Sequence, residues 1–121
     1  MKVQQMPYEH IPLEELRGEM RAIIDGVRTA KSTEEILALR QRYLALRVRY
    51  GTAVNLCYIR YSCNTADEYY TKEQEYLDEI GPEMSSLDTE YGNALLASPF
   101  RAELEKALSP VYFRYLEVAS K

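Results

Sequence analysis

The feature that most constrains this chain is the spacing of its apolar residues, which recur at steps of three and four along most of the sequence. Such spacing places side chains on one face of an α-helix, because an α-helix has about 3.6 residues per turn. The first stripe predicts a helix over residues 12–29 and consists of Leu13, Leu16, Met20, Ile23, Ile24 and Val27.

A second helix is predicted to follow Ser32, which forms a capping-box pair with Glu35 and gives a typical helix start. Gly51 lies within this helix without breaking its phase, and the run ends before Asn64. At about 1.5 Å per residue the helix is about 45 Å long. Its stripe consists of Ile36, Leu39, Tyr43, Leu46, Tyr50, Val54, Cys57 and Tyr61.

A third helix is predicted from a second capping box, formed by Thr65 and Glu68, through about Ile80. The Gly81-Pro82 pair then interrupts the helical pattern. A fourth helix either restarts at Pro82 or continues from the third with a kink, because proline removes a helical hydrogen bond but suits a first helical turn. Its stripe consists of Met84, Leu87, Tyr91, Leu95 and Leu96.

Two short helices are predicted after Ser98-Pro99 and Ser109-Pro110, where a hydroxyl residue precedes a proline. The predicted fold is all-α, an antiparallel bundle of four main helices plus the short C-terminal ones. Residues 1–11 form an extended segment and 12–121 the helical domain. The last helix, over 111–121, remains amphipathic without a stop signal, so we expect the chain to be part of a larger helical protein.

Charge and hydropathy exclude several classes of function. The net charge is −4 and basic residues alternate with acidic ones, so no basic surface for nucleic acid or anionic membranes is predicted. No apolar run approaches the roughly 20 residues that span a bilayer, and the first twelve residues lack an export signal. We therefore expect a cytoplasmic protein.

The residues most often used in catalysis and metal binding are sparse. Cys57 and Cys63 would lie about 9 Å apart along one helix, too far for a disulfide. His10 is the single histidine and lies between two prolines, where a surface or packing role is expected. A zinc site or a nucleophilic triad would have to recruit it across the sequence. We therefore predict no catalytic, cofactor-binding or metal-binding residue in this chain.

The third helix carries two distinct arcs. Glu68, Lys72, Glu75 and Glu79 form an acidic arc expected to face solvent, and the opposite arc holds Tyr69, Tyr70, Tyr76, Leu77 and Ile80. This tyrosine arc is read as core or domain-interface packing, with a ligand-binding wall as the alternative.

Glu73 falls near the centre of the apolar arc, where an unpaired carboxylate is costly to bury. We predict that it belongs to a structural hydrogen-bonded cluster; a catalytic carboxylate is the alternative. The predicted donors all lie on the second helix and are Arg40, Arg47, Tyr50 and Tyr58.

Several blocks of sequence resemble, in order and spacing, the amino-terminal region of the oligoendopeptidase F branch of the thimet-oligopeptidase-like zinc metallopeptidases. They are MPYE at 6–9, IRY at 59–61 with NT at 64–65, DEYY at 67–70, YLDEIGP at 76–82 and ALLASPFRAEL at 94–104. The resemblance covers nearly the whole chain. The run His10-Ile11-Pro12 and the two cysteines depart from the pattern expected for that family.

The resemblance implies a much larger helical enzyme that hydrolyses short peptides with a zinc held by an H-E-x-x-H helix and a downstream glutamate. None of those residues is present here, so the chain is expected to be inactive alone, with zinc in the full-length parent. Its expected role is a non-catalytic wall of the substrate channel, with the catalytic domain and an oligopeptide substrate as partners. The alternative is a free-standing helical interaction module, and the chain by itself is expected to self-associate or expose an apolar patch.

Overall fold

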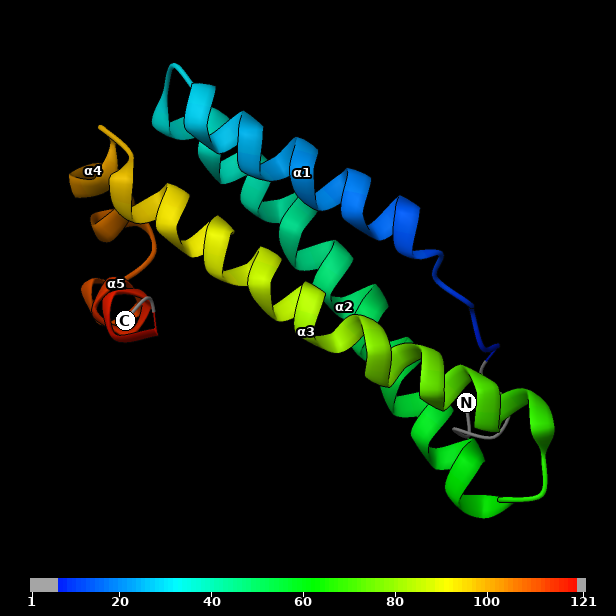
Figure 1. Ribbon diagram of the computed structural model, residues 1–121. Helices are drawn as coiled ribbons and strands as arrows, with labels where there is room; N and C mark the ends of the chain where they lie inside the picture. Colours follow the sequence, from blue (N-terminus) through cyan, green and yellow to red (C-terminus); the bar gives the residue numbers. More distant parts are fainter. Residues whose placement is uncertain (1–6, 120–121) are drawn as a thin grey trace.

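The computed structural model describes residues 7–119, and those residues form five α-helices and no strand (Figure 1). The all-α prediction is therefore confirmed. Of the predicted extended segment over residues 1–11, the described residues 7–11 are irregular. The helices are α1 (Leu13–Thr29), α2 (Thr33–Cys63), α3 (Glu68–Ala97), α4 (Arg101–Ala107) and α5 (Pro110–Ala119).

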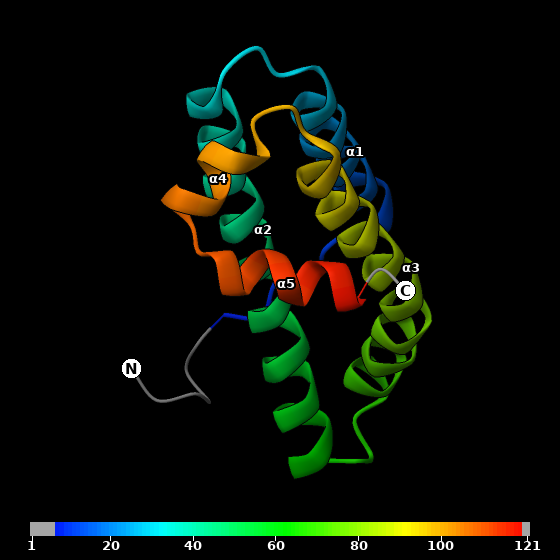
Figure 2. The same ribbon diagram turned by 90° about the vertical axis from the view of Figure 1, so that its left-hand side faces the viewer.

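Helix α2 runs antiparallel to α1 and α3, which run in the same direction as each other, and the three long helices pack side by side, as Figures 1 and 2 show. Short connections join them, which is the geometry of an up-and-down bundle. The shorter α4 and α5 turn back at one end of the bundle, and α5 crosses the direction of the long helices in Figure 2. No helix within residues 7–119 has the length and apolarity needed to cross a bilayer.

Helix starts follow the hydrogen bonds available to the first turn. Ser32 caps α2 as predicted, since its hydroxyl accepts a hydrogen bond from the Glu35 amide at 3.2 Å. The predicted cap of α3 at Thr65 is wrong. Asp67 caps this helix instead, because its carboxylate accepts hydrogen bonds from the amides of Tyr69 and Tyr70.

The third and fourth predicted helices are one helix, α3, which continues through Pro82. Pro82 is exposed, whereas Ile80 and Met84 on either side of it are 4% and 2% exposed. A proline inside a helix costs about 3 kcal/mol through its lost hydrogen bond and its ring. Burial of the two flanking side chains offsets this cost, so the packed face holds the helix together and the bundle has three long helices.

The short helices begin differently from each other. Pro110 is the first residue of α5, as predicted. In contrast, α4 begins at Arg101, and Pro99 lies in the preceding turn. The Ser98 hydroxyl accepts a hydrogen bond from the Phe100 amide at 3.1 Å and stabilises this turn before the helix starts.

A single apolar core lies between the long helices and extends under α4 and α5. The predicted stripe of α1 is buried from Leu16 to Val27, with Leu13 at its edge. Two helices approach closely at Gly26, where an added Cβ would lie 2.8 Å from a methyl carbon of Leu39. Bidentate hydrogen bonds from Arg17 to Glu83, at 2.5 and 3.0 Å, join the polar edges of α1 and α3.

The segment before α1 also packs on the core. Ile11 is 1% exposed, and its carbonyl accepts a hydrogen bond from the Tyr76 hydroxyl at 2.7 Å. Figure 1 shows this segment running from the start of α1 toward the opposite end of the bundle. We call residues 8–11 the strap. It covers α3 beyond the point where α1 begins.

Candidate functional site

Glu73 is buried, with 8% of the residue exposed, and both of its partners come from the strap. The Tyr8 hydroxyl donates to Glu73 Oε1 at 2.7 Å, and His10 Nδ1 lies 2.7 Å from the same oxygen. The structural cluster predicted around Glu73 is therefore confirmed. A carboxylate only accepts, so Nδ1 of His10 carries the proton in this hydrogen bond.

The environment of Tyr8 shows how this cluster is held. Its ring packs edge-on against Tyr70, with centroids 5.5 Å apart, and against Tyr69 at 6.2 Å. Burial, and then the hydrogen bond to Glu73, raise the pKa of Tyr8 well above its ordinary value. The hydroxyl therefore stays protonated and remains a donor across the neutral range.

The four donors predicted for Glu73 were the wrong ones. Arg40 donates to the Tyr112 hydroxyl at 3.1 Å, and Arg47 lies 3.3 Å from Asp88. Tyr50 packs against the Arg47 guanidinium, and Tyr58 is 61% exposed. Helical periodicity located the buried carboxylate but carried no information on the strap, which has no periodic pattern.

The two arcs of α3 are largely as predicted. The acidic arc is exposed, and Leu77 and Ile80 are buried. Tyr69 is the exception within the tyrosine arc, because it is 52% exposed. Tyr70 and Tyr76 are half-buried, and both hydroxyls are hydrogen-bonded. The Tyr70 hydroxyl accepts from the Arg60 guanidinium at 2.9 Å, and the Tyr76 hydroxyl donates to the Ile11 carbonyl.

The cysteines and the histidine do not form a reactive or metal-binding centre. Cys57 is buried and Cys63 exposed, and both are free. Burial raises the pKa of the Cys57 thiol, which disfavours the nucleophilic thiolate. Residues 7–119 contain no group of three or more His, Cys, Asp or Glu side chains able to hold a metal ion. This donor set does not fit a catalytic zinc, which needs three protein ligands.

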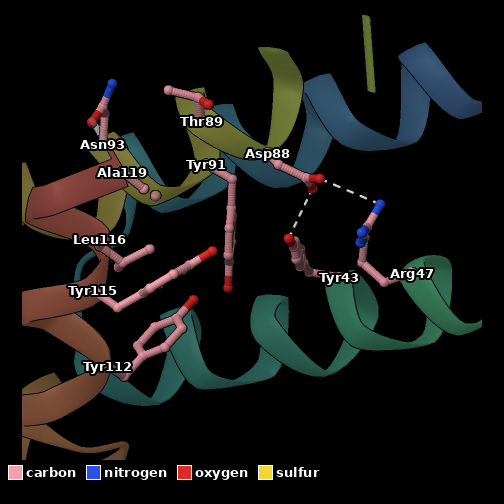
Figure 3. Close-up of a pocket in the computed structure, with 11 residues that line it drawn as sticks. Tyr43, Arg47, Asp88, Thr89, Tyr91, Asn93, Tyr112, Tyr115, Leu116 and Ala119 are labelled. Carbon is pink, nitrogen blue, oxygen red and sulfur yellow. Dashed lines mark hydrogen bonds and ion pairs between the residues drawn. The ribbon is translucent and has the colours of Figure 1, made fainter. Parts of the chain in front are cut away.

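A cleft of about 270 Å³ lies between α2, α3 and α5 (Figure 3). We call it the tyrosine cleft, because four tyrosines line it. No sequence pattern predicted it, since its walls come from three helices with no shared motif. Its lining residues are Tyr43, Arg47, Asp88, Thr89, Tyr91, Gly92, Asn93, Tyr112, Tyr115, Leu116 and Ala119.

One side of the tyrosine cleft is a fixed network. The rings of Tyr43 and Tyr91 stack with centroids 3.9 Å apart. The Tyr43 hydroxyl donates to Asp88 at 2.8 Å, and the same carboxylate pairs with Arg47. Burial, and then the Asp88 charge, raise the pKa of Tyr43. Asp88 is thus neutralised by its own neighbours.

The other side of the cleft contains a buried polar atom that lacks a well-formed hydrogen bond. Tyr91 is 1% exposed, and within residues 7–119 its hydroxyl makes no hydrogen bond of good geometry, although the Arg40 guanidinium lies close enough to interact with it. Burial raises its pKa to about 12, although the nearby charge of Arg40 opposes this rise. Figure 3 shows the rings of Tyr112 and Tyr115 reaching from α5 toward Tyr91. A buried hydroxyl without a well-formed hydrogen bond is uncommon in native proteins and identifies this part of the cleft as a candidate binding site.

Comparison with known proteins relates the whole chain to one family. Residues 3–121 match the family model described as the Peptidase M3 N-terminal domain. A solved structure assigned as an oligoendopeptidase F superposes with a TM-score of 0.92 at 37% identity and covers 99% of this chain. A Pz peptidase A with a bound inhibitor gives 0.91 at 30% identity over 98% of this chain.

A third solved structure, assigned as an oligoendopeptidase F from Bacillus anthracis, gives a TM-score of 0.89 at 34% identity over 97% of this chain. No curated protein sequence matches the chain significantly. The chain spans about a fifth of the three solved proteins, at 21%, 21% and 22% of their lengths.

Proposed function

Because this chain belongs to the Peptidase M3 N-terminal domain family, we propose that it is the non-catalytic helical domain of a zinc oligoendopeptidase that hydrolyses short peptides. In this proposal it forms part of the wall of the substrate channel. The observation that carries the proposal is the family match over residues 3–121, which leaves no large segment of this chain for a second function.

The side chains available as metal ligands support a role in shaping the substrate channel rather than in catalysis. A zinc peptidase needs metal ligands and a general base on the metal-bound water. The single histidine is hydrogen-bonded to Glu73, and residues 7–119 offer no group able to hold a metal. The ligands and the base therefore belong to the catalytic domain in this proposal, and we derive no reaction step from this chain.

The surface of α5 supports docking against that catalytic domain. Val111, Tyr115 and Val118 are 64%, 67% and 71% exposed on this ten-residue helix. We call these three residues the α5 face. Large exposed apolar side chains in one place are typical of interaction surfaces. A single rigid helix presenting them suits a permanent contact between domains.

The test compares three samples with a quenched fluorescent peptide and zinc. They are the 121-residue chain alone, the polypeptide encoded downstream in the same reading frame, and their mixture. We expect chelator-sensitive cleavage only where the downstream polypeptide is present, with the mixture favouring short peptides over an unfolded protein.

Cleavage by the 121-residue chain alone would contradict the proposal. A stop codon directly after Lys121 would do so as well and would favour a free-standing interaction module that uses the α5 face. If the downstream polypeptide preferred short peptides to the same degree with and without this chain, the proposed role in the channel wall would be wrong.

A further inference from the structure

We propose that the tyrosine cleft binds the C-terminal residue of a short peptide, with the terminal carboxylate bound by tyrosine hydroxyls near Arg40. The identity of the ligand as a peptide rests on the proposed function, whereas the preference for a carboxylate follows from the cleft itself.

The cleft offers donors that no acceptor among the described residues uses. The buried Tyr91 hydroxyl makes no hydrogen bond of good geometry, and its one near neighbour, the Arg40 guanidinium, is itself a donor and leaves the phenol hydrogen unused. The Tyr112 hydroxyl accepts from Arg40 at 3.1 Å, so its own hydrogen is directed elsewhere. Both residues line the cleft, and Figure 3 shows their hydroxyl ends near each other. Two neighbouring phenolic donors match the paired oxygens of a carboxylate.

The charges around the cleft favour an anion over a cation. Asp88 is the acidic residue of the lining, and it is already engaged by Arg47 and by the Tyr43 hydroxyl. Arg40 adds a second guanidinium, which lies 4.7 Å from the centre of the Tyr112 ring. Two guanidiniums against one carboxylate leave the surroundings positive, so an ammonium ligand would be repelled although the walls are aromatic.

The size of the cleft limits the ligand to about one residue. Its volume of about 270 Å³ lies just below the range of roughly 300–1,000 Å³ typical of small-molecule sites. The walls away from the hydroxyls are the rings of Tyr43 and Tyr115 and the side chain of Leu116. These surfaces suit an apolar or aromatic side chain next to the carboxylate.

The experiment is a titration of the 121-residue chain, followed by amide chemical shifts, with three probes. The first is a tripeptide ending in phenylalanine with a free carboxylate, the second is the same tripeptide as its C-terminal amide, and the third is phenylacetate. We expect shifts in α3 and α5 next to the cleft, with the free tripeptide binding at least about tenfold tighter than its C-terminal amide, as expected for about 1.4 kcal/mol.

The Tyr91→Phe variant removes the buried hydroxyl and keeps the stacked ring. We expect it to bind the free tripeptide about tenfold more weakly, because the hydroxyl would donate a hydrogen bond to a charged group. Its melting temperature should change little, since the hydroxyl makes no hydrogen bond of good geometry to a described residue. Tyr58→Phe on the exposed side of α2 is the matched control and should change neither quantity.

Equal binding of the amide would overturn the carboxylate assignment, and equal binding of phenylacetate would assign the cleft to free organic acids. Unchanged affinity in Tyr91→Phe with a lowered melting temperature would assign the hydroxyl to the fold. These outcomes are independent of the zinc-peptidase assays, so a failure here is distinguishable from a failure of the proposed function.

Discussion

Glu73 and His10 are 63 residues apart in sequence, yet Nδ1 of His10 lies 2.7 Å from a carboxylate oxygen of Glu73. The strap is therefore attached to the surface of α3 by a partly buried polar contact as well as by the packing of Ile11. Hydrogen bonds to a charged group are the strong ones, and a buried carboxylate that loses them becomes costly.

The first prediction concerns this attachment. Glu73→Ala removes the acceptor for both Tyr8 and His10, and we expect a loss of about 2–3 kcal/mol in the free energy of unfolding. Glu73→Gln keeps one acceptor oxygen and should lose less. Urea denaturation measures both. Glu79→Ala on the exposed arc is the control, and a loss there as large as that of Glu73→Ala would contradict the role of the buried contact.

The second prediction concerns alkaline pH. Tyr91 has a pKa raised from 10.0 to about 12 by burial, so above pH 10 the unfolded state loses this proton before the folded state does. Stability therefore falls as pH rises from 10 to 12, by about 1.4 kcal/mol per pH unit for one such group. We expect Tyr91→Phe to lessen this slope by that amount. Denaturation midpoints at a series of pH values measure it, and an unchanged slope would contradict the burial of the hydroxyl.

The third prediction concerns acid pH. Hydrogen bonding to Arg17 lowers the pKa of Glu83 from 4.5, so the ion pair contributes stability above that pH and loses it as pH falls through the folded-state pKa. Arg17→Gln should reduce stability at neutral pH and flatten its decline below pH 4.5. Melting temperatures over that pH range provide the measurement. Parallel curves for the variant and the wild type would show that the pair is not formed in solution.

The fourth prediction separates two kinds of helical glycine. At Gly51 and Gly81 an added Cβ would have no heavy atom of a neighbouring group within 4 Å, so alanine at either should stabilise the protein by about 1 kcal/mol. At Gly92 the added Cβ would lie 3.0 Å from a methyl carbon of Leu116. Gly92→Ala should therefore gain nothing and should disturb the tyrosine cleft. A thermal scan of the three variants tests this, and an equal gain at Gly92 would mean that α5 packs more loosely.

The fifth prediction concerns the α5 face. Val111→Ser combined with Val118→Ser should weaken binding to the separately produced downstream polypeptide about tenfold or more, because two exposed apolar side chains leave the interface. The fold should be unaffected. Val48→Ser, at a residue 68% exposed on α2, is the control for a general loss of surface hydropathy. Equal weakening by both would contradict docking through α5.

Helix positions could be predicted from the sequence because periodicity and capping are local. The stripe of α1 and the Ser32 cap were located from residues within about one helical turn of one another. The continuity of α3 through Pro82 depends on burial of Ile80 and Met84 against other helices, which a local pattern does not contain. The Asp67 cap could not be predicted from the capping-box rule, because Thr65 satisfies it with Glu68 whereas Asp67 is followed three residues later by Tyr70.

The candidate site was less predictable. The buried position of Glu73 could be predicted from its place on the α3 arc. Its partners could not, since Tyr8 and His10 lie in a segment without periodic apolar residues. The tyrosine cleft likewise depends on how α5 turns back over Tyr91, and this turn is set by tertiary packing between α3 and α5 rather than by spacing along either helix.

The strap has a consequence for the order of events during synthesis. Tyr8 is made 65 residues before Glu73, so the strap can dock only after α1, α2 and the start of α3 have been synthesised. Closing so long a loop becomes favourable only after the helices have assembled. The strap thus stays undocked until the first turns of α3 have been made, whereas α4 and α5, which are synthesised later, are not needed for its contacts with Glu73 and Tyr76.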